Sequence, residues 1–359
     1  MARKKSFFDG FLYVINTIAA FALLCAYLSH YVDPRYFSWF SFLGLAYPYL
    51  LLSNLLFAIW WALRLKIKII LPVVAIAIGY NEIPKLYQIK GQKEVVSAGE
   101  KLKVMSFNVR MFNVFNWLDD DNIPSKIEAL IKETDPDILI LQEYHQVEEP
   151  KSFGYPYQHK IFSDKAGATG QLILSKYPLS NSNYQAYKVP EGSESNGGVL
   201  YCDVDWKGQK IRVFNAHLAS VGLADSDYQN LAHLNDKNTL EIKRDLGKIS
   251  GDLKRAFVKR SYQTETLDSL IRTSDTPIIL AGDFNDPPCS YTYSTLTEQL
   301  EDSFLSAGEG LVRTYNRGPL PLRIDYVLYD KGYFRCTEYQ VMTEKLSDHY
   351  PVITEFARR

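Results

Sequence analysis

The sequence predicts a mixed α/β domain preceded by an N-terminal transmembrane helical segment. The first 80 or so residues are dominated by apolar runs with few charges. From Lys101 onward, short β-rich apolar runs alternate with helical stretches and turn signals, which is typical of an α/β domain. We therefore expect a helical region over residues 1–80, a linker over 81–100 and a soluble domain over 101–359, which is long enough to bury one large core.

Two charge-free runs of the helical region are long enough to cross a bilayer as helices. The first covers residues 11–28 and follows three cations at residues 3–5, and the second covers residues 36–63 and ends at Trp60 and Trp61, followed by further cations. About 20 apolar residues span the hydrocarbon, and indole rings followed by cations favour its interface. We expect spans over about 11–29 and 40–63. A cleaved signal peptide is the alternative for the first run, but no small-residue cleavage site follows it.

A third apolar run, residues 69–80, decides the side of the membrane on which the soluble domain would lie. The run is short and contains Pro72. Cation clusters favour the cytoplasmic side. Two spans would return the chain to the cytoplasm, whereas a third span over 69–80 would place the domain on the periplasmic or extracellular side of the inner (cytoplasmic) membrane. We favour three spans, because both cation clusters then lie inside and the third run has no other obvious purpose.

Charge and cysteine content exclude some classes of protein and leave others open. Residues 1–99 hold ten of the 40 basic and four of the 41 acidic residues, so the rest of the chain carries 30 and 37, a balance of −7. Binding of nucleic acid through a strongly basic surface is therefore not indicated, although a bound metal can supply local positive charge. The four cysteines have no paired spacing, so neither a zinc site nor a disulfide framework is predicted.

Polar side chains follow several apolar runs of the soluble domain at the point where each run ends. A single such residue is usually a turn former, but the full set can meet at one rim of a sheet pair. A pocket of carboxylates is costly unless a cation occupies it, and oxygen ligands favour Mg²⁺, with Mn²⁺ or Ca²⁺ as substitutes. Adjacent imidazoles and an aspartate could then transfer protons during in-line attack by water. The residues in question are Asn108, Glu143, His217, Asp283 and Asn285 at the ends of such runs, Asp325 within one, and Asp348 and His349 immediately before another.

With these residues in order, the sequence resembles the endonuclease/exonuclease/phosphatase superfamily, which has the deoxyribonuclease-I-like fold. The resemblance implies a four-layer sandwich of two packed β-sheets flanked by helices, with the active site on one rim. It also implies a hydrolase that acts on phosphoester bonds. Seven segments carry it: 106–108 (Ser-Phe-Asn), 141–143 (Leu-Gln-Glu), 170–178, 215–218 (Asn-Ala-His-Leu), 282–288 (Gly-Asp-Phe-Asn-Asp-Pro-Pro), 323–326 (Arg-Ile-Asp-Tyr) and 347–352 (Ser-Asp-His-Tyr-Pro-Val).

The resemblance also implies a role for each matching residue. Glu143 would be the principal Mg²⁺ ligand with Asn108 beside it, and Asp348 would bind the metal or a metal-bound water. Asp283 would orient or deprotonate the attacking water, and Asn285 would hold a non-bridging phosphate oxygen. His349 would contact the scissile phosphate, and Asp325 would orient its imidazole. His217 gives a site with two histidines, which is similar to deoxyribonuclease I and the neutral sphingomyelinases. The hydrophobic N-terminus and the segments around Ser290 and Thr314 look like the membrane-attached bacterial branch.

The long segment between His217 and Pro277 could set the substrate. Residues 239–273 are predicted to be mostly helical, and mixed charges along them are typical of a solvated face. The alternative is that Lys259, Arg260 or Gln263 faces the cleft and meets a phosphate or lipid headgroup. We list Arg260 and Gln263 as candidate substrate-binding residues.

The sequence thus predicts a membrane-anchored, Mg²⁺-dependent phosphodiesterase whose partners are the lipid bilayer and a phosphoester substrate. An enzyme fixed to a bilayer meets lipid headgroups at high effective concentration, so a lipid-linked phosphodiester and nucleic acid are both candidate substrates. A phosphomonoesterase is one alternative. A catalytically inactive, membrane-attached binding module of the same fold is another, although the residues that such modules lose are all present here. No protein partner is inferable.

Overall fold

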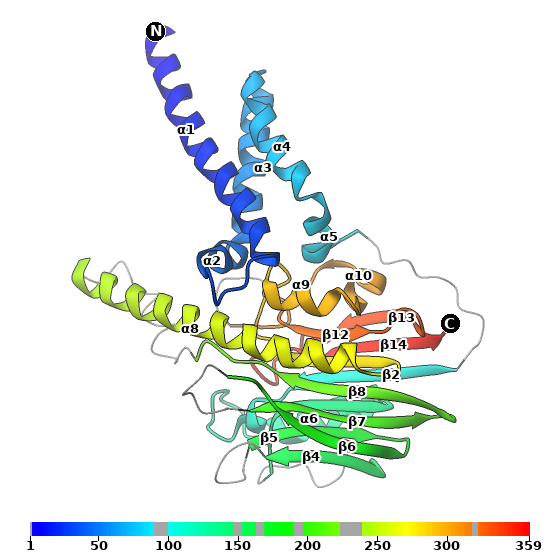
Figure 1. Ribbon diagram of the computed structural model, residues 1–359. Coiled ribbons are helices and arrows are strands. Elements are labelled where there is room, and N and C mark those ends of the chain that lie inside the picture. The colour runs from blue at the N-terminus through cyan, green and yellow to red at the C-terminus, as the bar shows by residue number, and fades with distance from the viewer. Residues whose placement is uncertain are drawn as a thin grey trace.

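The computed structural model of the protein describes residues 2–89, 100–146, 153–162, 169–189, 197–222, 239–317 and 322–359. Within these ranges, two six-stranded sheets pack face to face and helices cover their outer faces, while a bundle of apolar helices rises from one side (Figure 1). This arrangement confirms the predicted sandwich of two sheets flanked by helices.

The first sheet brings together strands from the start and the end of the soluble domain. Strands β2 and β3 are parallel, and the other neighbours in this sheet are antiparallel. In order, its strands are β13 (Phe334–Val341), β14 (Val352–Arg358), β2 (Lys101–Asn108), β3 (Ile138–His145), β5 (Thr169–Ser175) and β4 (Tyr157–Phe162).

The second sheet is built in the same way from the middle of the chain. Strands β8 and β9 are its parallel pair, so each sheet has a parallel pair near its centre. In order, its strands are β10 (Glu301–Asp302), β12 (Asp325–Tyr329), β9 (Ile278–Asp283), β8 (Gln209–His217), β7 (Gly198–Trp206) and β6 (Leu179–Ala186).

Apolar side chains fill the space between the sheets and beneath the helices. Val104 and Ile140 of the first sheet and Val213 and Ile279 of the second are completely buried in one cluster between them. Alternate residues of a strand point to opposite faces, so the other faces need covers of their own. The first sheet is covered by α6 (Ile123–Thr134) and η4 (Arg110–Asn113), and the second by α8 (Thr239–Arg272), α9 (Tyr291–Thr297) and, at its edge, α10 (Ser303–Ala307).

The helical region contains one helix that is long and apolar enough to cross a membrane by itself. That segment is Phe7–His30, with a mean hydropathy of 2.0. Two bent pairs pass the same test only as pairs: Trp39–Leu45 with Tyr47–Leu63 (66° apart) and Ile67–Ile78 with Tyr80–Leu86 (56° apart). The predicted spans over 40–63 and 69–80 therefore coincide with bent segments, and the number of spans stays a prediction. The elements are α1 (Ala2–Tyr27), η1 (Leu28–His30), α2 (Trp39–Leu45), α3 (Tyr47–Leu63), η2 (Ile67–Ile69), α4 (Ile70–Ile78) and η3 (Tyr80–Glu82).

The first part of the predicted linker is folded against the soluble domain. Helix α5 (Ile83–Leu86) is followed by strand β1 (Tyr87–Gln88), which pairs with β11 (Gly310–Leu311). The buried Arg323 also donates a hydrogen bond of 3.1 Å from Nη2 to the backbone oxygen of Lys85. Residues 90–99 lie outside the described ranges. The linker expected over 81–100 therefore begins with an ordered connection, which loss of apolar character alone did not reveal.

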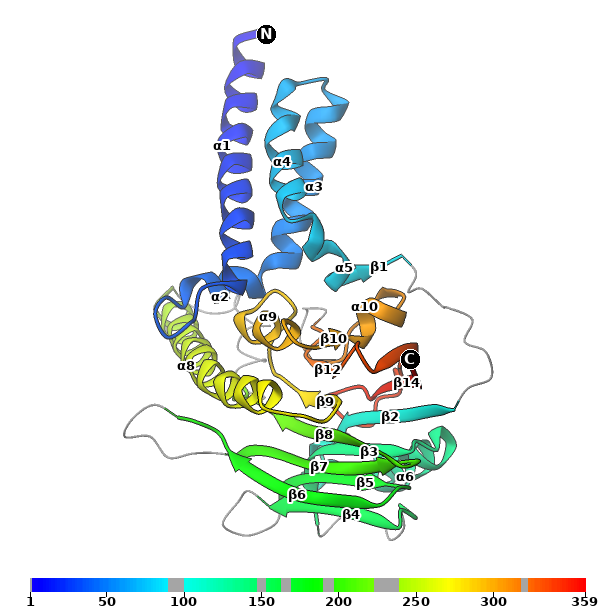
Figure 2. The same cartoon turned by 45° about the vertical axis from the view of Figure 1, so that its right-hand side comes forward.

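The lower end of the helical region packs directly on α8 and on the loop before α9 (Figure 2). Phe42 of α2 meets Phe257 of α8 with ring centroids 5.2 Å apart, and Arg35 reaches Glu265 of α8 at 2.8 Å. Gly44 of α2 lies so close to the loop that a Cβ atom there would be 2.3 Å from the backbone oxygen of Cys289. We call these contacts of residues 29–45 with α8 and residues 286–290 the junction.

Candidate active site

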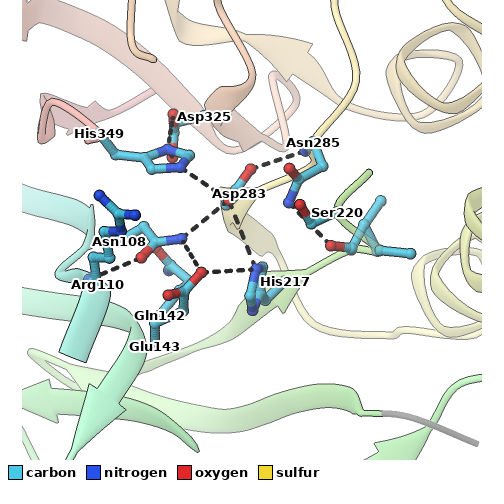
Figure 3. Close-up of polar contacts among 12 residues, drawn as sticks. Asn108, Arg110, Gln142, Glu143, His217, Ser220, Asp283, Asn285, Asp325 and His349 are labelled. Atoms are coloured by element: carbon cyan, nitrogen blue, oxygen red, sulfur yellow. Dashed lines mark hydrogen bonds and ion pairs between the residues drawn. The ribbon is translucent and has the colours of Figure 1, made fainter. Parts of the chain in front are cut away.

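Three neighbouring strands of the second sheet place three predicted site residues side by side. His217 ends β8, Asp283 ends β9 and Asp325 begins β12. In the sheet register, Asp283 is the Cα partner of both His217 and Asp325. The pairing of these strands therefore explains why residues more than 100 positions apart in the sequence meet at one rim (Figure 3).

Gly282 makes the close approach of β8 and β9 possible at this rim. Its φ of +143° favours glycine, and a Cβ atom there would lie 1.9 Å from the backbone oxygen of Ala216. Any side chain would force the two strands apart immediately before His217 and Asp283. The glycine that precedes Asp283 is therefore part of the geometry of the site.

The first sheet supplies Asn108 and Glu143 from the opposite side. Asn108 ends β2 and pairs in register with Gln142 of β3. The register of β3 with β5 shifts between Leu141 and Tyr144, and Glu143 within that shift has a φ of +48°. Such bulges re-aim side chains and occur next to active sites. The irregularity turns Glu143 toward the second sheet, where its Oε1 lies 3.7 Å from Nε2 of His217.

The Asn108 amide joins the carboxylates of the two sheets. Its Nδ2 donates to Oε1 of Glu143 and to Oδ2 of Asp283, both at 3.1 Å, while its Oδ1 accepts a hydrogen bond from the backbone N–H of Arg110 (Figure 3). Asn108 is completely buried. Asn108 therefore fixes the separation of Glu143 and Asp283. This positioning is a second task besides the predicted place of Asn108 next to the metal ligand Glu143.

A second buried amide pair, which the sequence did not single out as part of the site, lies directly behind this one. Gln142 donates a hydrogen bond of 2.9 Å to Oδ1 of Asn215, and both side chains are completely buried. Asn215 in turn donates to the backbone oxygens of Leu141 and Leu172. The hydrogen bond between Gln142 and Asn215 and those that Asn215 donates tie the two sheets together beneath the site. Gln142 and Asn215 belong to the segments 141–143 and 215–218 that carry the family resemblance. This was the sequence signal by which they could have been found.

His349 and Asp325 form a buried pair at the centre of the site. The imidazole is 5% exposed and Asp325 is 2% exposed. Nδ1 of His349 donates to Oδ2 of Asp325 at 2.9 Å, which leaves Nε2 facing Oδ2 of Asp283 at 3.6 Å. Burial alone would lower the pKa of His349, but the charges of Asp325 and Asp283 outweigh it and raise this pKa to about 10. The site therefore favours the imidazolium.

Negative charge exceeds positive charge at this rim. Burial raises the pKa of Asp325 to about 6, and the charge of Asp283 adds to the rise, although His349 opposes it. Asp283 and Asp325 can each bring an oxygen, and His349 a nitrogen, to within 4.8 Å of one another. Glu143 has a side chain 27% exposed to the cleft. Hard oxygen donors that repel one another fit a divalent cation such as Mg²⁺.

Asp348 lies at the same rim but is paired with an arginine that sequence reasoning missed. Nε of Arg110 lies 3.3 Å from Oδ2 of Asp348, and the guanidinium stacks over the Trp117 ring, 4.1 Å from its centroid. The backbone at Arg110 has a φ of +43°. A cation two residues after Asn108 was the only signal for it. Asp348 would therefore bind a metal while it is paired with Arg110.

Asn285 is held at the rim by its own backbone and by the neighbouring strand end. Its backbone N–H donates to Oδ1 of Asp283 at 2.8 Å, and its Nδ2 donates to the backbone oxygen of Leu218 at 3.1 Å. An amide nitrogen carries two hydrogens, so one remains for a ligand in the cleft. The position expected for a phosphate-binding Asn285 is thus compatible with the structure.

Arg260 and Gln263, predicted to bind substrate, lie on α8 at the edge of the cleft and are both 1% exposed. Arg260 donates to the backbone oxygen of Ala219 at 2.8 Å and to Asp286 at 3.0 Å. Gln263 accepts a hydrogen bond of 2.8 Å from the backbone N–H of Ala219. The two side chains therefore hold the backbone N–H and the backbone oxygen of Ala219, two residues after His217. Arg260 also lines the cleft that contains His349, and Gln263 lines the cleft on the side of His217. The structure shows that both side chains position the loop at Ala219, and their contact with substrate stays a prediction.

Two clefts meet at these residues. One of about 350 Å³ contains Asp283, Asn285, Asp348 and His349 and extends toward the helical region, and one of about 450 Å³ lies on the side of His217. Glu143 lines both clefts. A phosphate at Glu143 would therefore have space for a substituent on either side.

Residues 105–349 match the family described as Endonuclease/Exonuclease/phosphatase family. The chain belongs to this family, as its seven segments indicated, and family membership assigns it to hydrolases that act on phosphoester bonds. Residues 9–86 match a second family, described as a domain of unknown function (DUF8431). That match ends with α5, so it covers the helical region and its ordered connection. No curated protein matches the chain.

Solved structures of low sequence identity share the fold. A humanized TDP2 of D. rerio carrying 14 mutations is 17% identical, with a TM-score of 0.52 over 71% of this chain and 98% of that chain. The catalytic domain of human Nocturnin with a bound sulfate anion is 16% identical, with a TM-score of 0.51 over 74% of this chain and 97% of that chain. D. rerio TDP2 complexed with a single-strand DNA product is 16% identical, with a TM-score of 0.52 over 72% and 99%.

Proposed function

We propose that the protein is a membrane-anchored, divalent-metal-dependent phosphodiesterase. The observation that carries the proposal is the buried His349–Asp325 pair beside Asp283, facing Glu143 and Asn108 across the rim. This set provides a proton donor, a carboxylate base and hard metal ligands within one cleft. The substrate is a phosphodiester of a lipid or of a nucleic acid.

The chain's own residues divide the work of an in-line displacement. Asp283 orients water and accepts its proton as the water oxygen bonds to phosphorus and the ester oxygen leaves. Asn285 donates a hydrogen bond to a non-bridging phosphate oxygen. His349 gives its Nε2 proton to the ester oxygen as the bond to phosphorus breaks, so that this oxygen leaves as an alcohol, and Asp325 holds the imidazole in the orientation that this requires. The products are a phosphomonoester and an alcohol.

Glu143, Asn108 and Asp348 would hold the metal, of which Mg²⁺ fits the oxygen donors best and Mn²⁺ or Ca²⁺ are substitutes. When bound, the ion would act as a Lewis acid that offsets the negative charge of the phosphoryl group. Nε2 of His217 lies 3.7 Å from both Oε1 of Glu143 and Oδ2 of Asp283, so its imidazole is within reach of a phosphate bound there.

The apolar helices support membrane attachment of the catalytic domain. Large apolar side chains of α1 face outward, including Phe7, Ile18 and Phe21, which are 81%, 64% and 68% exposed. Polar contacts occur instead between helices, as where Trp61 donates to Asn16 at 2.9 Å. We propose three spans, with the catalytic domain on the periplasmic or extracellular side.

Hydrolysis of bis(p-nitrophenyl) phosphate by the full-length chain in nanodiscs tests the proposed chemistry. We expect turnover with Mg²⁺ or Mn²⁺, its loss in EDTA, and much slower release from p-nitrophenyl phosphate, which a phosphomonoesterase would prefer. Failure to hydrolyse the diester, combined with failure to bind either ion, would instead identify an inactive binding module.

A further inference from the structure

The two clefts that meet at Glu143 differ in character. The cleft on the side of the helical region has a continuous apolar wall. The cleft beyond His217 has fewer apolar side chains, among them Ile161 and Leu218, and is lined also by glycine backbone and by polar groups such as Gln171. We call the first the membrane-side cleft. The side chains of its apolar wall are Leu45, Ile249, Leu253, Phe257, Leu322 and Ile324.

The wall is assembled from both regions of the molecule. Leu45 ends α2 of the helical region, and Ile249, Leu253 and Phe257 lie at helical spacing along one face of α8. The ring contact between Phe42 and Phe257 holds α2 against α8. The apolar surface therefore continues from the helices of the proposed anchor down to the carboxylates of the site.

Exposed aromatic residues lie on the segment that leads to Leu45 of this wall. Tyr36 and Trp39, which precede and begin α2, are 85% and 67% exposed. Helix α8 passes beneath α2, across the base of the helical bundle (Figure 1). Aromatic side chains at such a level are typical of a membrane interface. The membrane-side cleft thus opens where lipid would be.

Positive charge in the membrane-side cleft is mostly neutralised. Of its three arginines, Arg110 is paired with Asp348 and Arg260 with Asp286. A polyanionic nucleic acid needs cations along its backbone, whereas an amphiphile needs one phosphate site next to an apolar surface. The lining of the cleft matches the second requirement.

We infer that the apolar wall binds the hydrocarbon chain of an amphiphilic phosphodiester, so that the enzyme acts on a membrane lipid. This inference rests on the proposed function. The chain lies along Leu45, Leu253 and Phe257, the phosphate lies at Glu143 and Asp283, and the polar substituent occupies the cleft beyond His217.

A series of p-nitrophenyl alkyl phosphates, from methyl to octyl, tests the inference with the full-length chain in nanodiscs. Every member has the same phosphate and the same leaving group, and only the alkyl chain differs. We expect kcat/KM to rise by about two- to four-fold for each methylene that reaches the wall. The methyl ester measures hydrolysis without a contribution from binding of an alkyl chain.

Two leucine variants separate the wall from simple partition into the bilayer. Leu253→Gln changes a side chain of the wall, whereas Leu246→Gln changes a leucine on the same helix that is 45% exposed and does not line the cleft. We expect L253Q to lose most of the rise with chain length, measured as the ratio of kcat/KM on the octyl ester to kcat/KM on the methyl ester. L246Q keeps the full rise.

The possible outcomes distinguish the two proposals. A rise that L253Q abolishes and L246Q keeps supports the inference. An equal rise in all three proteins means that partition causes it and overturns the inference, as does a flat series or a single-stranded oligonucleotide cleaved faster than the octyl ester. In those cases hydrolysis of the methyl ester leaves the proposed function standing. Absence of hydrolysis throughout overturns the proposed function, and the inference with it.

Discussion

The catalytic rim and the junction border the same cleft but are held together in different ways. At the rim, side chains from several strands are placed by sheet register and are almost completely buried, as Asn108, Asp283 and Asp325 are. At the junction, residues 29–45 meet α8 and residues 286–290 through separate side-chain contacts. Some are buried, such as Ser261 with Asp33 at 2.6 Å, and others are exposed, such as Arg35 with Glu265, whose side chains are 23% and 43% exposed. The difference suggests that the junction can loosen without moving the rim.

The largest expected effect comes from Asp283→Asn. This change keeps the shape of the side chain but removes the base and one of the carboxylates of the metal pocket. We expect kcat/KM on bis(p-nitrophenyl) phosphate to fall by about 10³- to 10⁴-fold, with little change in the thermal unfolding midpoint.

Asp203→Asn is the matched control for that variant. Asp203 lies in β7 of the same sheet, is 1% exposed and is paired with Arg212 at 2.7 Å, away from the rim. Its loss should cost about 1–3 kcal/mol of stability and leave the rate on the diester unchanged. If D203N and D283N hydrolysed the diester at the same rate, Asp283 would have no specific role in catalysis and would matter only for folding.

Asp325→Asn should have the next largest effect and should also change the pH dependence. In the original protein the raised pKa of His349, about 10, keeps the imidazolium present through neutral pH, and activity should decline only as the pH approaches that value. Without the Asp325 charge, the effect of burial is opposed less strongly, so the pKa of His349 should fall below that of the original protein. The decline should then begin at a lower pH, with a loss of about 10²- to 10³-fold in kcat/KM at slightly alkaline pH.

A pH profile of kcat/KM for both proteins measures this effect. If the rate declined at the same alkaline pH in D325N and in the original protein, His349 would not be the residue that transfers the proton. Recovery of D325N activity at a lower pH would support the assignment, because a structural defect would reduce the rate at every pH.

Glu143→Gln should weaken metal binding while leaving the rest of the rim in place. The amide can still accept the hydrogen bond from Asn108 but lacks the charge that a divalent cation needs. We expect the Mg²⁺ concentration for half-maximal activity to rise by about 10- to 100-fold. Titration of activity with Mg²⁺ measures it, and Glu344→Gln, an exposed glutamate, is the control. An unchanged requirement in E143Q would assign the ion to other ligands.

The fold and the residues of the rim were predictable because both depend on short stretches of sequence. Short apolar runs predicted the strands, and polar residues at their ends marked Glu143, Asp283 and His349 before their positions were known. The family resemblance then supplied the sandwich.

Contacts between distant segments were not predictable in the same way. Arg260 and Gln263 were expected to face a ligand, yet the cations of α8 look alike in sequence, and only packing against Ala219 distinguishes these two residues from solvated ones. The bulge at Glu143 and the approach at Gly282 depend on neighbouring strands. The junction depends on how residues 29–45 meet α8, for which the sequence carries no local signal.

The smallest expected effect comes from loosening the junction with Arg35→Ala. Arg35 pairs with the buried Asp33 at 2.6 Å and with Glu265 at 2.8 Å, and it lies 4.7 Å from the Tyr262 ring centroid. Its loss should therefore cost about 1–3 kcal/mol of stability. Arg272→Ala is the matched control, because Arg272 lies near the other end of α8 and pairs there with Asp268 and Glu298 at similar distances. We expect R35A to keep its rate on bis(p-nitrophenyl) phosphate but to lose about three-fold on the octyl ester, since Leu45 of α2 is less firmly held. R272A should change neither rate. A parallel fall on both substrates in R35A would mean that the junction and the rim are one cooperative unit, and the separation drawn between them would be wrong.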